Sequence, residues 1–348
     1  MAPPAPARRP TIRDVAARAG VSQPTASLVL GRHPTARVAP ATRQCVLDAA
    51  AELGYTPNRV AQALVRGRSF SLALVVPDPR NPFFADVAYG AERVAARRGY
   101  ALLLVATRDR PLRETVATLR ARQVDGALLE AQGAAALPAD ALAGLEVVLM
   151  DEPPTPIAPG VATDAVAAGR LAADHLLALG HRTLAFVGPA TDVHTFRMRE
   201  RGFVQRLREE GVTLASERLR RVPPTVAGGR EAMRALLALR HRPTAVFCAN
   251  DLVALGALKQ AAAQKVAVPG ELSIVGCDDI EMATLVTPEL TTVAVPAREL
   301  GARAARLLID RLEGRAPAVA GQKPLPVALV RRGTAGPAPV PPTLDRAA

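Results

Sequence analysis

From Ser71 onward the chain alternates short, uninterrupted apolar runs with stretches of helical pattern. Within the runs, apolar and polar residues do not alternate, so both faces of each expected strand should be covered. Strands buried on both faces belong to parallel sheets with helices on either side, so we predict an α/β body. The runs are SLALVV, ALLLVA, GALLE, VVLM, TLAFVG, TAVFC and LSIVG, which begin at residues 71, 101, 126, 147, 183, 244 and 272.

The length of this body fits two such doubly wound sheets. Helical stretches end at glycines before the next strand, as at Gly99, Gly180 and Gly211. We expect a junction near Gly169 and a late return to the first lobe through the strand TTVAV and a helix over 298–313. The domain would span 70–333, with an N-lobe at about 70–168 and 296–325 and a C-lobe at about 169–295 and 326–333. A ligand would bind in the cleft between the lobes, at the carboxyl ends of the strands.

The first 56 residues have a different pattern, that of three short helices. Thr11 with Asp14 forms a capping-box signal, Gly20 ends the first helix, and Ser22 caps the second. A third helix is expected over residues 40–53. We therefore predict a helix-turn-helix domain at 11–56, in which small residues let the first two helix axes approach closely. These small residues are Ala16, Ala17, Ala19 and Ala26.

This front segment is also strongly basic. Residues 1–68 hold ten arginines and three acids, 10 − 3 = +7, so of the total charge of +12 only +5 falls on the other 280 residues. A basic head on a nearly balanced body indicates a polyanion partner, although basic tails often serve only solubility. The outward side chains of the second helix are short or polar and suit phosphates and base edges; they are Gln23, Thr25, Ser27 and Leu28.

No catalytic or cofactor motif is found. The turns contain neither G-x-G-x-x-G nor G-x-S-x-G, and the five histidines lack zinc-ligand spacing, so we expect no enzyme, no cofactor and no metal. The cysteines at positions 45, 248 and 277 stand singly and are expected in the core. Without a secretory signal or a membrane-spanning run, we expect a cytoplasmic protein that makes no membrane contact.

Polar and aromatic residues follow several of the expected strands. An arginine, carboxylates and amides around aromatic rings fit a polyhydroxylated ligand, because hydroxyls pair with the charged groups and the C–H face packs on rings. The alternatives are core packing for each ring and helix capping for Asp278, whereas Asp279 and His181 are expected to be structural. The candidates are Asn81, Phe83 and Phe84 after the first strand, Asp151, Asn250 and Asp278 after later strands, and Arg199, which is expected to open a helix.

The segments TIRDVAARAGVSQPTASLVLG and VAPATRQCVLDAAAELGYTPNRVAQALVRGRS strongly resemble the lactose- and galactose-repressor family of bacterial transcription regulators. The resemblance implies that the second helix reads an operator through Gln23, Pro24 and Leu28. Leu28 departs from the basic residue often found there, and Ala39 from the usual serine cap of the third helix. The DNA-binding set it implies is Thr11, Ser22, Gln23, Pro24, Thr25, Ser27, Leu28, Arg32, Asn58, Arg59, Ala61 and Leu64.

By the same resemblance, residues 57–69 form a hinge helix that pairs with its twin in the minor groove. A helix of this length is not stable alone in water, so its formation on DNA can act as a switch. Leu64 matches the family's wedge that opens a base step. The alternative is a leucine packed against the body.

The body looks like the periplasmic ribose-binding type, and the resemblance carries effector contacts onto Asn81, Phe83, Phe84, Asp151, Arg199, Asn250 and Asp278. Glu152 stands where ribose binders have an arginine, and Val295 where a glutamine often sits. The ligand class is thus a sugar or sugar derivative, without support for ribose itself.

Together these features predict a homodimeric transcriptional regulator, most simply a repressor, on pseudo-palindromic operator DNA in the bacterial nucleoid. The alternative is a sugar-binding protein of transport or chemoreception without a DNA role. Residues 1–10 and 334–348 are expected to be disordered tails.

Overall fold

The computed structural model describes residues 10–31, 38–56, 67–107, 110–130, 139–155, 158–190, 193–315 and 323–339. The chain divides into two compact units, Met1–Ser69 and Phe70–Ala348.

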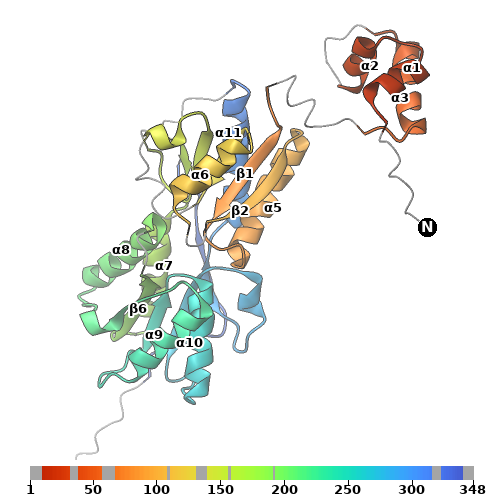
Figure 1. Cartoon of the computed structure of the whole chain (residues 1–348). Helices are drawn as coiled ribbons and strands as arrows, with labels where there is room; N and C mark the ends of the chain where they lie inside the picture. The colour runs from red at the N-terminus through yellow and green to blue at the C-terminus, as the bar shows by residue number, and fades with distance from the viewer. Residues whose placement is uncertain are drawn as a thin grey trace, which may run out of the picture. The chain divides into compact units, whose positions relative to one another are not determined.

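The first unit is a three-helix domain built from α1 (Ile12–Arg18), α2 (Gln23–Leu30) and α3 (Pro40–Glu52) (Figure 1). The expected capping box is present, because Thr11 accepts from the Asp14 N–H and Asp14 accepts from the Thr11 N–H at 2.7 Å. Ala39 makes no capping bond at the start of α3, also as expected. Ala17 is exposed, however, so it does not mediate the approach of α1 and α2. The core consists of Val15, Ala16, Ala26, Val29, Val46, Ala49 and Ala50.

The body begins with a five-stranded, wholly parallel sheet in the order β2-β1-β3-β4-β5. Its strands are β1 (Ser71–Val76), β2 (Ala101–Ala106), β3 (Gly126–Leu129), β4 (Glu146–Met150) and β5 (Gly160–Val161). Alternate residues of β1 face two different cores. Leu72 and Leu74 belong to the first core, and Ala73 and Val75 belong to the second. Helices α5 (Pro82–Arg97) and α11 (Ala297–Leu312) cover the first face, and α6 (Leu112–Ala121) covers the second.

A second sheet has six strands in the order β11-β10-β9-β8-β6-β7. All its pairs are parallel except β10 with β11, which is antiparallel. Its strands are β6 (Leu184–Pro189), β7 (Leu219–Val222), β8 (Ala245–Cys248), β9 (Ser273–Asp278), β10 (Thr291–Ala294) and β11 (Ala328–Val330). Its helices are α7 (Ala165–Ala178), α8 (His194–Glu209), α9 (Val226–Leu237) and α10 (Asp251–Ala263).

The predicted fold class is therefore confirmed: an all-helical head and a body of two α/β lobes (Figure 1). The short strands β5, β7 and β11, of two to four residues, were not among the expected strands. No helix among the described residues is both long enough and apolar enough to span a bilayer.

The chain passes between the two sheets three times. It leaves the first after β5, returns after β10 to form α11 against the first sheet, and re-enters the second as β11. Two of these connections lie side by side, because the Leu325 N–H donates to Ala162 O and the Asp164 N–H to Leu325 O at 2.8 and 2.9 Å. The lobes are thus joined by adjacent, hydrogen-bonded chain segments.

Three helix pairs of the body cross at glycines contributed by both partners. A Cβ on Gly301 of α11 would lie 2.0 Å from Val87 O of α5, and one on Gly90 would lie 1.9 Å from Arg298 O. The same reciprocal arrangement joins α7 to α8 and α9 to α10. The backbones therefore touch directly, and these positions exclude any side chain. The further pairs are Gly169 with Gly202 and Gly229 with Gly256.

The predicted tail at 334–348 is wrong over its first six residues, 334–339, whereas the residues after 339 lie outside the described part of the chain. Thr334 is fully buried and exchanges two hydrogen bonds with the backbone of Ile274, at 2.7 and 2.8 Å. Buried His181, structural as expected, bonds Thr244 and the Gly336 carbonyl at 2.9 and 3.0 Å. This segment, rich in Gly and Pro, is ordered because its backbone pairs with the second sheet.

We predict that Gly256→Ala lowers the free energy of unfolding of the body by about 2 kcal/mol or more. The new Cβ would lie 2.1 Å from Val226 O, and a backbone carbonyl cannot move aside alone. Chemical denaturation followed by circular dichroism measures the change. Lys259→Ala, at an exposed position of the same helix, is the control and should leave the midpoint unchanged; equal midpoints for both variants would contradict the glycine contact.

Candidate functional site

In the first unit, α2 presents a polar, solvent-facing surface at its start. Gln23, Pro24, Ser27 and Leu28 are exposed, with Leu28 at 40%, and Thr25 is half-buried. Arg13 of α1 donates from Nε to the Gln23 side chain at 3.3 Å, so the first expected reading residue is held by the neighbouring helix. The surface combines a helix N-terminus, which favours anions, with side chains short enough for close approach.

The remaining DNA-contact candidates divide into two groups. Thr11 and Ser22 are the helix caps, and the Ser22 hydroxyl lies 2.8 Å from that of Thr25 while accepting from the Thr25 N–H at 3.3 Å. The candidates that lie outside the described residues are Arg32, Asn58, Arg59, Ala61 and Leu64.

In the body, Arg199 and Asp278 form a buried ion pair. The guanidinium donates to Asp278 Oδ1 at 3.0 Å and to the Ala249 carbonyl at 2.6 Å, with the two side chains 3% and 6% exposed. Arg199 was expected at the start of a helix, but it lies in the second turn of α8. Burial raises the pKa of Asp278 to about 7, an effect that the charge of Arg199 opposes. Asp278 is thus a charge partner rather than a helix cap.

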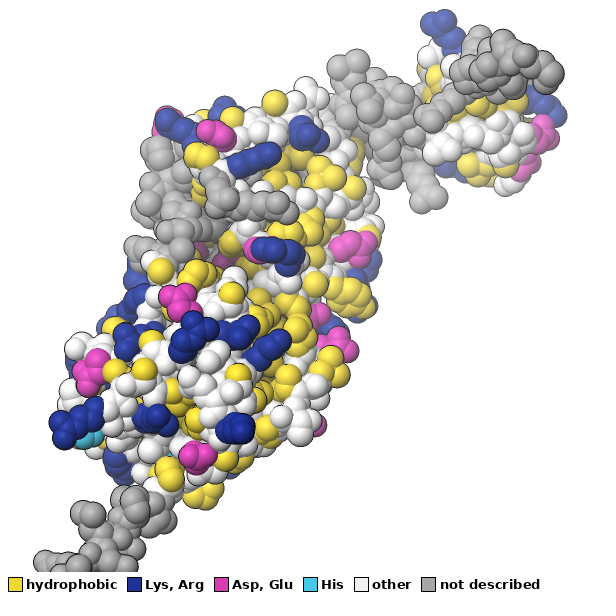
Figure 2. Space-filling model, turned by 60° about the horizontal axis from the view of Figure 1, so that its bottom comes forward, with side chains coloured by type: hydrophobic (Ala, Val, Ile, Leu, Met, Phe, Trp, Pro, Cys, Tyr) yellow, Lys and Arg dark blue, Asp and Glu magenta, His cyan; other side chains and the backbone are white. Residues whose placement is uncertain are grey.

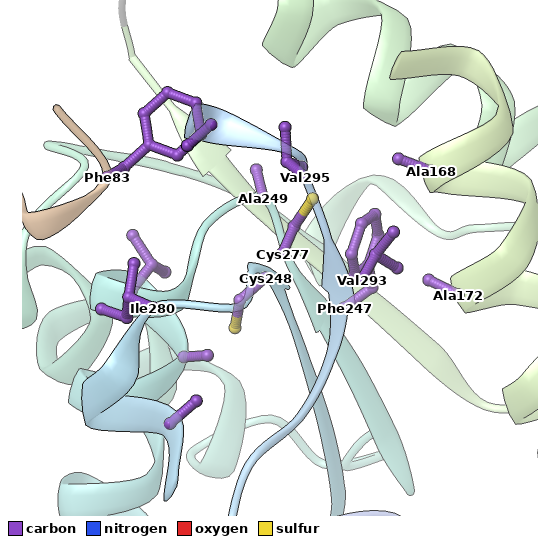
Figure 3. Close-up of a cluster of buried hydrophobic side chains, with 14 of the residues drawn as sticks. Phe83, Ala168, Ala172, Phe247, Cys248, Ala249, Cys277, Ile280, Val293 and Val295 are labelled. Atoms are coloured by element: carbon purple, nitrogen blue, oxygen red, sulfur yellow. The ribbon is translucent and has the colours of Figure 1, made fainter. Parts of the chain in front are cut away.

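A cavity of about 310 Å³ lies beside this pair. Phe83 from the start of α5, Asp278 at the end of β9 and Val295 after β10 all line it. Figure 3 shows the Phe83 ring and the Val295 side chain at one end of the buried apolar cluster, with Ile280 nearby. Phe84 meets Phe83 edge to face at 5.4 Å and is buried in the same core, but it does not line this cavity.

The two candidate asparagines cap helices. Asn81 accepts from the Phe83 N–H at 3.1 Å at the start of α5, and Asn250 accepts from the Val253 N–H at 2.9 Å at the start of α10. Each therefore fixes the helix that begins at the cleft edge of its sheet. Direct effector contact by their amide groups stays a prediction.

Asp151 braces the connection between the lobes. It follows β4 with φ of 56° and accepts from both the N–H and the hydroxyl of Thr163, at 3.2 and 2.5 Å. This bond ties the end of β4 to the segment that leads into the second lobe. Asp279, expected to be structural, pairs with Arg332 at 2.6 Å.

Two polar residues of this region were not among the candidates. Glu130 directly follows β3, and its Oε2 is buried without a hydrogen-bond partner among the described residues. Thr195 lies four residues before Arg199 on α8, and its buried hydroxyl also has no such partner. A carboxylate directly after an apolar run is the signal that selected Asp151, and it applies equally to Glu130. The spacing of four residues on one helix would have found Thr195.

Charges near the cleft are mostly acidic. Burial raises the pKa of Glu130 from 4.5 to about 8, with a further contribution from the carboxylates of Asp151, Glu152 and Asp278. Burial lowers the pKa of His194, whose Nδ1 lies 3.9 Å from Glu152. No group of His, Cys, Asp or Glu suited to hold a metal ion occurs among the described residues.

A larger hollow of about 570 Å³ lies along the outside of α8, lined by Arg197, Arg201, Arg208 and Arg221 among others. None of the candidate effector residues lines it. Over the face of the body in Figure 2, basic and acidic side chains are interspersed. The cavity beside the Arg199–Asp278 pair, in contrast, is lined by candidate residues from both lobes, Phe83 and Asp278.

Two families match the chain. Residues 11–58 match the bacterial regulatory proteins of the lacI family, and residues 173–335 match the periplasmic binding protein-like domain. The repressor PurR of Mannheimia succiniciproducens is 35% identical over 87% of this chain and 92% of its own length. The repressor CytR of Escherichia coli K12 is also 35% identical, over 87% of this chain and 90% of its own.

Solved structures agree with these matches. The lac repressor dimer bound to operator and the anti-inducer ONPF has a TM-score of 0.84 at 28% identity, covering 94% of this chain and all of the other. The regulator CelR with cellobiose has a TM-score of 0.68 at 31% identity, with the same coverage. A ribose-bound regulator from Enterococcus faecium has a TM-score of 0.69 at 30% identity, covering 77% and 99%.

The relatives named here are HTH-type transcriptional repressors and not enzymes, and their similarity runs from the three-helix head through the two-lobed body. The predicted role of a DNA-binding transcriptional regulator is thereby confirmed. The chain belongs to the lacI family of bacterial regulatory proteins.

Proposed function

We propose that this protein is a homodimeric, cytoplasmic repressor whose operator affinity is controlled by a small polyhydroxylated effector bound between the two lobes. The observation that carries the proposal is the exposed start of α2, with Gln23 held by Arg13, in a chain that also builds a polar cleft between lobes. A transport or chemoreception protein would have no use for such a head. The match of residues 11–58 to a DNA-binding family therefore favours repression.

Operator reading is assigned to α2. Its N-terminal side chains enter the major groove, where Gln23 makes hydrogen bonds to a base edge and Leu28 contacts a thymine methyl. One domain of this size makes few base contacts, so specific affinity requires two heads on a pseudo-palindromic site. By resemblance, residues 57–69 pair in the minor groove between the half-sites, with Leu64 as the wedge.

The effector is proposed to be a sugar or a sugar derivative. Arg199 Nε and the Thr195 hydroxyl are buried without partners among the described residues and offer hydrogen bonds to ligand hydroxyls. Phe83 supplies an apolar surface in the cavity that Asp278, the ion-pair partner of Arg199, also lines. Structures similar to this chain hold cellobiose and ribose, which supports the class of ligand and not its identity.

Dimerisation is assigned in part to the exposed edge of the first sheet. β2 pairs on one side only, with β1, and Leu103 and Leu104 on it are 41% and 53% exposed. An edge strand with uncovered apolar side chains favours association with another chain. A second copy of this chain is the proposed occupant.

The test is a titration. Operator duplexes are first selected from a randomised pool with the full-length protein, and affinity is then measured while candidate sugars are added. We expect at least one sugar that binds the body to change operator affinity. Steady operator affinity with every sugar that binds would remove the switching proposal.

We predict that Gln23→Ala lowers affinity for the selected operator by about 1–3 kcal/mol, because one base contact is lost. Binding to scrambled duplex, which depends on phosphate contacts, should change little. Gln44→Ala removes a glutamine of α3 that bonds Asp48 at 2.8 Å and serves as the matched control. Equal losses on operator and scrambled DNA would argue against base reading by Gln23.

We predict that Leu104→Asp weakens self-association by at least about tenfold, because a carboxylate replaces an apolar contact in the interface. Sedimentation equilibrium measures the dissociation constant. Leu47→Asp makes the same change at a leucine of α3 that is 44% exposed and should leave the dimer intact. An unchanged dimer in the Leu104 variant would exclude β2 from the interface.

A further inference from the structure

Glu130 is the feature of the cleft that the proposed function leaves unexplained. It ends β3, next to β4 in the first sheet, and its N–H donates to Val75 O at 3.0 Å. The residue is only 9% exposed, and Oε2 lies buried without a hydrogen-bond partner among the described residues. A buried carboxylate oxygen without a donor is unfavourable, and because none of the described residues supplies one, a bound ligand can take that place.

The surroundings of Glu130 decide what kind of donor fits. The charged groups with the largest effect on the pKa of Glu130 are Asp151 and Glu152 after β4, Asp278 at the end of β9, and Arg199 of α8. His194 lies beside Glu152 and is not a standing positive charge at neutral pH, because burial lowers its pKa. The guanidinium of Arg199 is already engaged by Asp278 and the Ala249 carbonyl. This corner of the cleft therefore has an excess of carboxylates over cations.

The other carboxylates already have donors within the chain. Asp151 is held by Thr163, Asp278 by Arg199, and Glu152 has partners of its own. Glu130 Oε2 is the carboxylate oxygen of this group that is buried without one. A neutral hydroxyl would satisfy the hydrogen bond, but it would not offset the charges of the neighbouring carboxylates Asp151 and Glu152. An ammonium group satisfies both requirements.

We propose that the effector is a hydroxylated primary amine, an amino sugar in chemical class, whose ammonium group binds the carboxylate of Glu130. The inference rests on the proposed function, since it names the ligand of the same cleft. The hydroxyls of this ligand meet Arg199 and Thr195, and the ammonium lies among Glu130, Asp151 and Glu152. Sugar phosphates and sugar acids are excluded, because their anionic groups would face this acidic corner.

The binding step moves a proton. Burial raises the pKa of Glu130 from 4.5 to about 8, so the free protein holds a proton on this carboxyl at neutral pH. The ion pair needs the carboxylate, so the proton leaves to solvent when the ammonium binds. Affinity for a protonated amine therefore rises with pH up to about 8 and then levels off. A neutral ligand that accepts a hydrogen bond from protonated Glu130 would show the opposite trend.

The experiment compares matched pairs of sugars on the full-length protein. D-glucosamine and D-galactosamine are titrated against D-glucose and D-galactose by isothermal calorimetry at about pH 6.5, in buffers of different ionisation heat. We expect at least one amine to bind at least about tenfold more tightly than its neutral counterpart, with release of roughly one proton. In Glu130→Gln the tenfold preference and the proton release should both disappear.

Two further measurements control for an unspecific loss of charge and for misfolding of the variant. Glu231→Gln, on the exposed face of α9, removes a carboxylate away from the cleft and should keep the preference. Thermal unfolding of Glu130→Gln reports its fold. The wild type should lose stability as pH rises toward 8, because only the folded chain holds the Glu130 proton in that range. The Glu130→Gln variant should lose less stability over the same pH range.

The outcomes separate this inference from the proposed function. If no amine is preferred, or if the preference survives in Glu130→Gln, the amine inference is overturned. If neutral sugars bind and shift operator affinity while the amines do not, the repressor proposal stands and the amine inference falls. If an amine binds through Glu130 but operator affinity never changes, the ligand class holds and the switching proposal falls.

Discussion

The direct contact of helix backbones at paired glycines determines much of the geometry of the body. Gly169 of α7 leaves no room for a Cβ, which would lie 1.9 Å from the carbonyl oxygen of Arg199 on α8. Gly202 makes the reciprocal contact with Val166 of α7. The helix that carries the cleft arginine is therefore positioned against α7 by direct contact of the two backbones. Side-chain packing alone adapts more easily and would not hold the guanidinium so closely against Ala249 and Asp278.

The pattern of apolar residues predicted the architecture well, because burial on both faces leaves a continuous apolar run in the inner strands. The edge strand β2 carries such a run as well, although Leu103 and Leu104 on it are exposed, so the expected burial of both faces is wrong there. Thr11, Asp14 and Ser22 also predicted the helix starts of the head, since capping depends on residues within one turn. The order at 334–339 could not be read in this way. Thr334 and Gly336 form hydrogen bonds with Ile274 and His181, which are distant in the sequence. No local sequence pattern predicts such pairing.

The cleft shows the same division between local and long-range information. Strand ends could be located from the sequence, so Asp278 and Asp151 were identified as candidates. Their hydrogen-bond partners could not be predicted from the sequence. The structure shows Asp278 paired with Arg199 and Asp151 with Thr163, while the asparagines at positions 81 and 250 cap helices. A polar residue at a strand end thus has two uses, bracing the fold or meeting a ligand. Only its partners distinguish them. By this criterion Glu130, Thr195 and Arg199 Nε, each buried without a partner among the described residues, are available to a ligand.

Control of DNA binding by such a cleft has a defined energetic requirement. To shift an equilibrium between two arrangements of the lobes from 1:99 to 99:1, the effector must prefer one arrangement by about 5.5 kcal/mol. Hydroxyl contacts within a single lobe do not contribute, because they are equal in both arrangements. Glu130 belongs to the first sheet and Arg199 to the second lobe. A ligand that contacts both therefore binds most tightly in the arrangement of the lobes that brings these two residues within reach of it. A charge-assisted bond on each side, formed where water is excluded, is strong enough to supply much of that preference.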